Sequence, residues 1–237
     1  MERQVVCYQD LGKMDYKTAW DYQEKLLHKN VRIKSAANGF TSVIDNESTT
    51  TNHLLFVEHP PVYTLGKSGK IENVLINEQQ RNERGIEFFH TNRGGDITFH
   101  GPAQIVGYPI LDLEKFYTDI GRYLRELEEV VILTLKEFGI DGGRSKGETG
   151  VWIDSTNTGK ERKICAMGVR CSRWITMHGF ALNVNTDLDY FNHIIPCGIQ
   201  NKKVTSLKEE TGNDLDIQEV KEKLKRNFEK VFNVDIF

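Results

Sequence analysis

Residues 86–110, IEFFHTNRGGDITFHGPAQIVGYPI, contain two strand-like runs separated by a polar, glycine-rich stretch. The runs at 86–90 and 105–110 are rich in aromatic and β-branched side chains, which favour strands. The stretch between them, 93–104, is too rich in glycine for a helix and too polar for a buried strand, so we predict a shaped loop. A strand at each end places such a loop on a packed scaffold, as in many binding sites.

The composition of this loop favours a binding loop over an ordinary turn between two strands. The adjacent Gly94 and Gly95 permit positive φ angles and a close approach of the backbone to another molecule. Side chains that carry hydrogen-bond donors surround the same bend: Arg93, Thr98 and His100. The chain contains neither the glycine fingerprint of dinucleotide-binding folds nor a phosphate-binding P-loop motif, so nucleotide binding has no support from a motif.

Strands and helices alternate irregularly over the rest of the chain. Further strand-like runs lie at 54–58, 62–65, 150–154, 163–170 and 174–185. Apolar residues recur at helical spacing in 17–29, 119–138 and 216–231. Gly139 is expected to end the second helix, and Asp216 with Glu219 resembles a capping box at the start of the third. Because hairpins need antiparallel pairs and no regular βαβ rhythm is present, we predict an α/β (α+β) fold with a mixed sheet flanked by helices.

Length and charge narrow the classes of function. A chain of 237 residues, of which 38% are hydrophobic, suits a single domain spanning 1–237. The formal net charge of -3 gives no basic field for nucleic acid, and no apolar run approaches the roughly 20 residues of a membrane span. The first residues, MERQ, lead into a mixed segment without the apolar core of a secretion signal, so we expect a cytoplasmic protein.

The cysteines differ in their surroundings. They are Cys7, Cys165, Cys171 and Cys197. None forms a C-x-x-C pair or has a histidine at zinc-finger spacing, so we expect no metal site. Cys7 and Cys165 have apolar neighbours and are expected to be small buried hydrophobic residues. Cys197 lies between a proline and a glycine at the end of a strand-like run, where a bend can present a nucleophile.

A nucleophilic cysteine needs a group that raises its thiolate fraction, usually histidine, lysine or arginine. Lys163 begins the run 163–168, whose other residues are small or apolar, so its ammonium is expected to point into a cavity. The alternative is an exposed lysine on a strand, since most lysines are solvated. His178 and His193 are the other candidate bases.

Taken together, the motifs resemble those of the lipoyl(octanoyl) transferase family. In chain order they are Leu11-Gly12 with Tyr16, Ala19 and Gln23; Glu58-His59-Pro60-Pro61-Val62-Tyr63-Thr64-Leu65-Gly66; the loop 93–104; Thr149-Gly150-Val151-Trp152; the run 163–168; His178-Gly179-Phe180-Ala181-Leu182-Asn183-Val184-Asn185; Pro196-Cys197-Gly198; and Thr205-Ser206-Leu207. Each motif alone is weakly specific, whereas their joint order over nearly the whole chain is highly specific.

The resemblance implies an acyltransferase with the catalytic fold shared by biotin and lipoate ligases, acting without a cofactor or a metal. Such an enzyme moves an octanoyl group from octanoyl-acyl carrier protein to a lysine of lipoyl domains. The acceptors implied are the lipoyl domains of 2-oxoacid dehydrogenase complexes and the glycine-cleavage H protein. Cys197 would carry the acyl group as a thioester, and Lys163 would lower the pKa of the Cys197 thiol and act as acid and base.

The resemblance also implies which residues bind the acyl substrate. They are Arg93, Gly94, Gly95, Asp96, Ile97, Thr98, Phe99, His100, Ala166, Met167, Gly168, Gly179, Phe180 and Ala181. His178 is a candidate supporting residue. Backbone amides at 166–168 or 179–181 are hypothesised to stabilise the tetrahedral oxyanion of acyl transfer.

The sequence departs from the family pattern at two places. Ala103 stands where the family usually has glycine, and its methyl group is expected to affect the preference for acyl-chain length. The polar excursion at 41–52 is longer than is typical.

Other functions stay open at this point. The nearest is an ATP-dependent lipoate or biotin ligase of the same fold, which needs no nucleophilic cysteine, so that Cys197 argues against it. A lipoyl-domain scaffold with a degenerate site is a non-enzymatic alternative, and a thiol protease or redox protein fits less well.

Overall fold

The computed structural model describes residues 3–37, 49–157, 159–195 and 203–237. In these residues, a nine-stranded sheet runs in the order β12-β1-β2-β6-β10-β9-β8-β7, and β11 pairs with β9 beside this path. The bounds are β12 (Val234–Ile236), β1 (Gln4–Lys13), β2 (Asn52–Glu58), β6 (Gln104–Ile110), β10 (Ile175–Asn183), β9 (Arg162–Ser172), β8 (Val151–Ile153), β7 (Gly142–Gly143) and β11 (Lys203–Val204). β1 pairs in parallel with β2 and β12, whereas β2, β6, β10, β9 and β8 pair antiparallel. The predicted mixed sheet is confirmed.

A second sheet of three strands lies beside the first. Its order is β4 (Glu87–His90), β3 (Val62–Leu65) and β5 (Ile97–His100). β5 corrects the sequence-based prediction, because part of the expected loop 93–104 is a fully buried strand paired with β3. The polar ring of His100 tolerates burial because it has a partner: its Nδ1 lies 2.9 Å from Gln104 Oε1.

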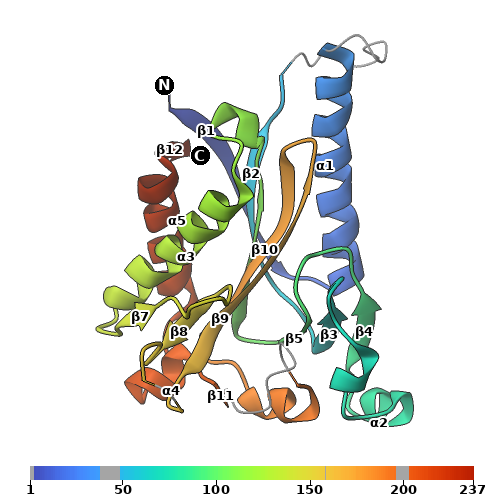
Figure 1. Cartoon of the computed structure of the whole chain (residues 1–237), viewed down its shortest axis with the longest axis vertical. Helices are drawn as coiled ribbons and strands as arrows, with labels where there is room; N and C mark the ends of the chain where they lie inside the picture. Colours follow the sequence, from blue (N-terminus) through green and yellow to red (C-terminus); the bar gives the residue numbers. More distant parts are fainter. Residues whose placement is uncertain (1–2, 38–48, 158, 196–202) are drawn as a thin grey trace.

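Helices cover the large sheet on both faces (Figure 1). α1 (Tyr16–Ala37) packs on one face against β6 and β10, while α3 (Ile120–Lys136) and α5 (Ile217–Phe232) pack against each other on the opposite face. The remaining short helices are η1 (Ile71–Asn73), α2 (Glu78–Glu83), η2 (Leu113–Lys115), η3 (Leu188–His193) and α4 (Leu207–Thr211). Among the described residues, no helix combines the length and apolar character needed to cross a membrane.

Capping residues explain where the long helices begin. Asp119 accepts a hydrogen bond from the backbone N–H of Arg122 at 2.9 Å, which starts α3 as predicted. Asp216 starts α5 by accepting from the N–H of Gln218 at 2.9 Å. Glu219 pairs with Lys223 rather than closing the expected capping box, so that part of the prediction is wrong.

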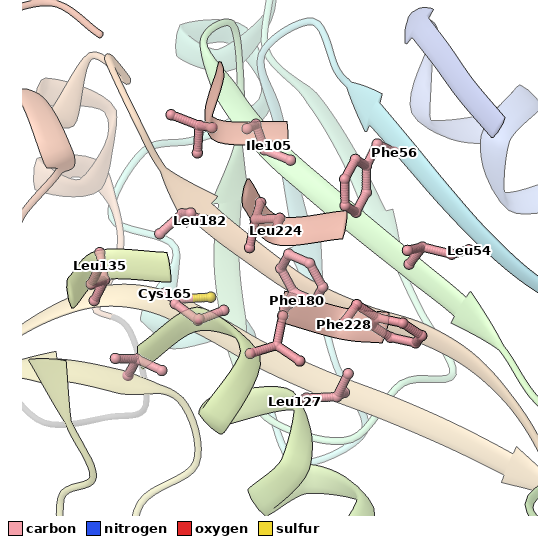
Figure 2. Close-up of a cluster of buried hydrophobic side chains, with 14 of the residues drawn as sticks. Leu54, Phe56, Ile105, Leu127, Leu135, Cys165, Phe180, Leu182, Leu224 and Phe228 are labelled. Atoms are coloured by element: carbon pink, nitrogen blue, oxygen red, sulfur yellow. The ribbon is translucent and has the colours of Figure 1, made fainter. Parts of the chain in front are cut away.

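The main core lies between the sheet and the α3–α5 pair. Figure 2 shows side chains of β2, β6, β9 and β10 facing side chains of the two helices. The labelled residues are Leu54, Phe56, Ile105, Leu127, Leu135, Cys165, Phe180, Leu182, Leu224 and Phe228. Cys165 is buried as expected, but Cys7 is only half-buried because β1 is covered incompletely.

Ala103 adopts a backbone conformation that favours glycine, with φ of 58°. Its N–H donates to Glu58 Oε2 at 3.1 Å, and its carbonyl accepts from the N–H of Asn185 and from Thr186 Oγ1, both at 3.1 Å. These hydrogen bonds hold the residue in the left-handed region despite the steric cost of its methyl group.

Replacing Ala103 by glycine is expected to raise the free energy of unfolding slightly. Relief of left-handed strain amounts to about 1–2 kcal/mol, and the greater freedom of glycine in the unfolded chain offsets about 0.4–1 kcal/mol of it. Urea denaturation of both proteins measures the difference. Among the described residues, Ala103 does not line the cavity between the two sheets, so the preference for acyl-chain length should stay the same. A lower stability of the variant would contradict the strain argument.

Candidate active site

A cavity of about 610 Å³ lies among strands of both sheets. Side chains of β5, β6, β9 and β10 line it together with the turn at 93–96, the segment 147–149 and the start of α1. Its volume falls within the roughly 300–1,000 Å³ of small-molecule sites. The lining combines apolar residues such as Val106 and Met167 with buried polar groups, an arrangement that suits a largely apolar ligand with one reactive end.

The structure brings nearly all of the predicted substrate residues to this one cavity. Those that line it are Arg93, Gly94, Gly95, Asp96, Ile97, Thr98, His100, Ala166, Met167, Gly168, Gly179, Phe180 and Ala181, together with Lys163 and His178. Phe99 is the exception, although Ile97, which shares its face of the strand, lines the cavity. The Phe99 ring stacks on Tyr190 at a centroid distance of 4.5 Å, in the core of the small sheet. Acyl binding by the lining residues stays a prediction.

Glycines allow the backbones around the cavity to approach each other. A Cβ atom at Gly168 would lie 2.5 Å from the carbonyl oxygen of Gly94, and one at Gly179 would overlap the carbonyl oxygen of Gly107. The N–H of Gly94 donates to the carbonyl of Val169 at 2.9 Å, which joins the turn of the small sheet to β9 of the large sheet. The glycines therefore set the closeness of the two sheets as well as the width of the cavity.

Substitution of Gly168 by alanine is expected to lower the free energy of unfolding by roughly 1–3 kcal/mol, because the new methyl group meets backbone that cannot give way easily. Gly94→Ala is a matched control, since its Cβ would lie 3.4 Å from the Val169 carbonyl oxygen and its φ is not positive. Urea denaturation curves compare the two variants. Equal stabilities would show that the contact between Gly168 and Gly94 is not tight.

Arg93 is buried and binds protein groups of the small sheet. Its Nη2 donates to the carbonyl and Oγ1 of Thr64 at 2.6 and 2.9 Å, and its Nη1 donates to the Gly94 carbonyl at 3.0 Å. These contacts fix the turn at 93–96 against β3. The guanidinium therefore shapes the cavity wall.

His178 lies at the cavity with its ring orientation fixed. Asn92 Nδ2 donates to Glu24 Oε1 at 2.9 Å, so Asn92 Oδ1 faces His178 Nε2 at 2.7 Å and accepts a hydrogen bond from its N–H. Burial, with Arg93 and Arg170 nearby, lowers the pKa of His178 to about 3. His178 is therefore neutral near pH 7 and a weak base, which fits a supporting role better than that of the activating base.

The other histidines give no better candidate for an activating base. Burial lowers the pKa of His59 to about 4 and, with His59 and Arg93 nearby, holds the pKa of His100 well below its usual range. His193 ends η3 and is not among the described residues that line the cavity.

Lys163 reaches the cavity, as its sequence context predicts. Its side chain is buried, and its Nζ lies 4.6 Å from the centroid of the Trp152 ring on β8. Its backbone carbonyl accepts a hydrogen bond from the N–H of Thr205 at 2.9 Å. Lys163 is also the strand partner of Val204, in the parallel pairing of β9 with β11. The interpretation as an exposed strand lysine is wrong.

Cys197 lies outside the described residues. The described chain is anchored before and after the segment 196–202 that contains it. The N–H of Ile195 donates to the Asn73 carbonyl at 2.8 Å, and β11 pairs with β9 at Arg162 and Lys163. Lys163 and Val204, on these paired strands, both line the cavity.

The described thiols are weak candidates for the nucleophile. Burial raises the pKa of Cys165, Cys7 and Cys171, and none of the three lines the cavity. In the part of the chain that the structure describes, no cluster of three or more His, Cys, Asp or Glu residues is placed to hold a metal ion.

Several lining residues were not predicted as parts of the site. They are Tyr16, Ser68, Val106, Tyr108, Ile120, Leu124, Gly147, Glu148, Thr149, Val169, Asn183, Phe191 and Val204. Tyr16, Thr149 and Asn183 belong to the motifs quoted above, which was the available signal for them. Ile120 and Leu124 follow the apolar period of α3 and look like core residues in the sequence. Periodicity alone therefore does not predict that they line the cavity.

Comparisons with known proteins show the family of this chain. Residues 15–229 match the model of the lipoyl protein ligase A/B catalytic domain. An octanoyltransferase of Flavobacterium johnsoniae is 57% identical over 231 residues, covering 96% of this chain and 97% of the relative. An octanoyltransferase of Christiangramia forsetii is 56% identical over 230 residues, covering 96% and 95%.

Solved structures show the same fold at low sequence identity. A bipartite lipoate protein ligase of Thermoplasma acidophilum has a TM-score of 0.67 and 18% identity, covering 100% of this chain and 86% of that one. A lipoate-protein ligase A bound with ATP has a TM-score of 0.67 and 16% identity, covering 100% and 88%. These likenesses confirm the ligase-like fold predicted from the sequence. The chain belongs to the family defined by the lipoyl protein ligase A/B catalytic domain.

Proposed function

We propose that the protein is an octanoyltransferase, which moves an octanoyl group from octanoyl-acyl carrier protein to a specific lysine of lipoyl domains. The observation that carries this proposal is the 57% identity to a protein named octanoyltransferase over 96% of the chain. The acceptors would be lipoyl domains of 2-oxoacid dehydrogenase complexes and the glycine-cleavage H protein. The whole chain, 1–237, would act as one catalytic domain in the cytoplasm.

The first half-reaction exchanges one thioester for another. The Cys197 thiolate attacks the carbonyl carbon of the carrier thioester, the carrier sulfur leaves, and it takes a proton from the Lys163 ammonium. The exchange is nearly balanced in free energy because both bonds are thioesters, so nucleotide activation is not needed. A cation beside Cys197 favours its thiolate, and the buried position of Lys163 at the cavity supports this role.

The second half-reaction forms an amide. The neutral amine of the acceptor lysine attacks the Cys197 thioester, its proton passes to the now neutral Lys163 amine, and the Cys197 thiolate leaves. The enzyme returns to its starting state, with an ammonium next to a thiolate, and amide formation drives the step. One lysine thus serves both half-reactions as acid and then as base.

The pairing of the strands bears on the hypothesis for the oxyanion donors. Phe180 and Ala181 pair with β6 on one side and with β9 on the other, so their backbone groups lie within the sheet ladders. Within the described residues, β9 pairs with β8 no further than Cys165, so residues 166–168 have one open edge. The pairing therefore favours, as oxyanion donors, those backbone amides of 166–168 that point to this edge, since successive amides of a strand point to opposite edges.

A comparison of acyl donors tests the proposed function. The purified protein and a lipoyl domain are incubated with octanoyl-carrier protein without ATP, or with free octanoate and ATP. Octanoylation of the lipoyl domain is expected only with the carrier-bound donor. The opposite pattern would favour an ATP-dependent lipoate ligase, for which the solved structures at 18% identity or less support only a shared fold.

A further inference from the structure

A completely buried carboxylate lies on α3, behind the wall of the cavity. Glu128 Oε2 accepts from Arg144 Nε at 3.0 Å and pairs with Arg125 Nη1 at 2.8 Å, while Oε1 accepts from the N–H of Gly150 at 2.9 Å. A buried charge is tolerated only where partners of this kind compensate its lost hydration. Burial accordingly raises the pKa of Glu128, and the Gly150 N–H and the two arginines oppose that shift.

The carboxylate holds both ends of the segment 144–150. Arg144 stands at the beginning of the segment and Gly150 at its end. Between them, Gly147, Glu148 and Thr149 line the cavity. One side chain of α3 thereby fixes a stretch of cavity wall that has no regular secondary structure of its own.

The end of this segment, at Gly150, lies close to the side chain of Lys163. Gly150 has φ of 116°, and a Cβ atom on it would lie 2.5 Å from the Cys165 carbonyl oxygen and 3.7 Å from Lys163 Cε. Two residues further on, the Trp152 ring lies against Lys163 Nζ. The backbone that Glu128 anchors at Gly150 therefore continues to Trp152, and both residues lie next to the Lys163 side chain.

We propose that Glu128 is a positioning residue for acyl transfer, which places the Lys163 ammonium by anchoring Gly150 and the segment 144–150. The assignment rests on the proposed function, in which Lys163 serves Cys197. A purely structural role would not require a charge, because well-packed apolar residues replace buried ion pairs without loss of stability in other proteins. The ionic cluster supplies directed hydrogen bonds, which fix a backbone position more closely than apolar contact does.

The test measures the reactivity of Cys197 in variants of Glu128. Glu128→Gln keeps the shape of the side chain and one oxygen for the Gly150 N–H, whereas Glu128→Ala removes every anchor. Glu129→Gln is the matched control, because Glu129 also binds Arg144, at 2.7 Å, but its side chain is 39% exposed. The rate of Cys197 alkylation by iodoacetamide is followed against pH by peptide mass analysis, together with the rate of acylation by octanoyl-carrier protein.

Glu128→Ala is expected to move the alkylation profile to higher pH by about one unit, and so to slow alkylation near pH 7 about tenfold. The alkylation profile of Glu128→Gln should lie between those of Glu128→Ala and the wild type, and the profile of Glu129→Gln should match that of the wild type. If Glu128→Ala does not fold, Glu128→Gln and Arg144→Gln must both show the shift. Folded Glu128 variants with the wild-type profile and acylation rate would overturn the proposal.

Failure of this inference can be told apart from failure of the proposed function. Alkylation needs no acyl donor, so the profile reports on Cys197 whether or not octanoyl transfer occurs. If the wild type forms no acyl adduct, the proposed function fails. If the wild type forms the adduct and the Glu128 variants behave like it, only the role of Glu128 fails.

Discussion

Replacing Cys197 by serine is expected to abolish the octanoyl adduct and to reduce transfer from octanoyl-carrier protein by at least on the order of 10³-fold. A serine hydroxyl has a far higher pKa than a thiol, so a neighbouring ammonium cannot populate its anion near pH 7. The variant should fold like the wild type, because the substitution changes one atom. Steady-state transfer to a lipoyl domain and intact-mass analysis measure the two effects.

Cys171→Ser is the control for this experiment. Cys171 is half-buried, burial raises the pKa of its thiol, and it does not line the cavity. Its variant should keep both the adduct and the wild-type rate. Near-normal transfer by Cys197→Ser would contradict the covalent mechanism.

Replacing Lys163 by methionine is expected to slow transfer by about 10²–10⁴-fold, the usual contribution of a positioned acid and base. Methionine keeps much of the side-chain volume against Trp152 but removes the charge. Because a cation favours the thiolate, its loss should raise the pKa of the Cys197 thiol and move the alkylation profile to higher pH. Iodoacetamide labelling over a range of pH measures this shift.

Two further variants separate the roles of Lys163. Arginine retains the positive charge but cannot give up its proton, so Lys163→Arg should keep much of the thiolate while lacking the acid of the first half-reaction and the base of the second. The carrier sulfur can still leave as a thiolate and take its proton from water, whereas amide formation has no such substitute for the base. Mixing this variant with octanoyl-carrier protein should accumulate an acyl-enzyme that transfers slowly. Lys203→Gln is the control, since Lys203 is exposed on the adjacent β11. Wild-type alkylation and transfer by Lys163→Met would contradict both roles.

Periodicity in the sequence predicted the long helices and most strands, because their apolar faces are continuous. It failed where tertiary partners decide the structure. β5 is buried although it contains polar His100, since Thr64 and Gln104 supply partners for its ring from other strands. β1 was not predicted from the sequence, because most of its side chains are not fully buried. Its parallel neighbours β2 and β12 also come from distant parts of the chain.

The site was predictable to the extent that its residues belong to ordered motifs. Those motifs named Lys163, and nearly all of the substrate residues that they imply line the cavity, with Phe99 in the core of the small sheet as the exception. Glu128 carried no signal, because it sits in an amphipathic helix and its partners Arg144 and Gly150 lie 16 and 22 residues away. The glycine that the family usually has at the position of Ala103 was the available signal for its left-handed conformation, and its hydrogen-bond partner Glu58 lies 45 residues away.

The mass of the wild-type protein after mixing with octanoyl-carrier protein, without ATP and without an acceptor, tests the covalent mechanism most directly. We expect the protein to gain the mass of one octanoyl group, which digestion and peptide mass analysis place on the peptide containing Cys197. Addition of a lipoyl domain should then return the protein to its original mass and octanoylate the domain. An unchanged mass, or an octanoyl group on Cys7, Cys165 or Cys171, would contradict the mechanism.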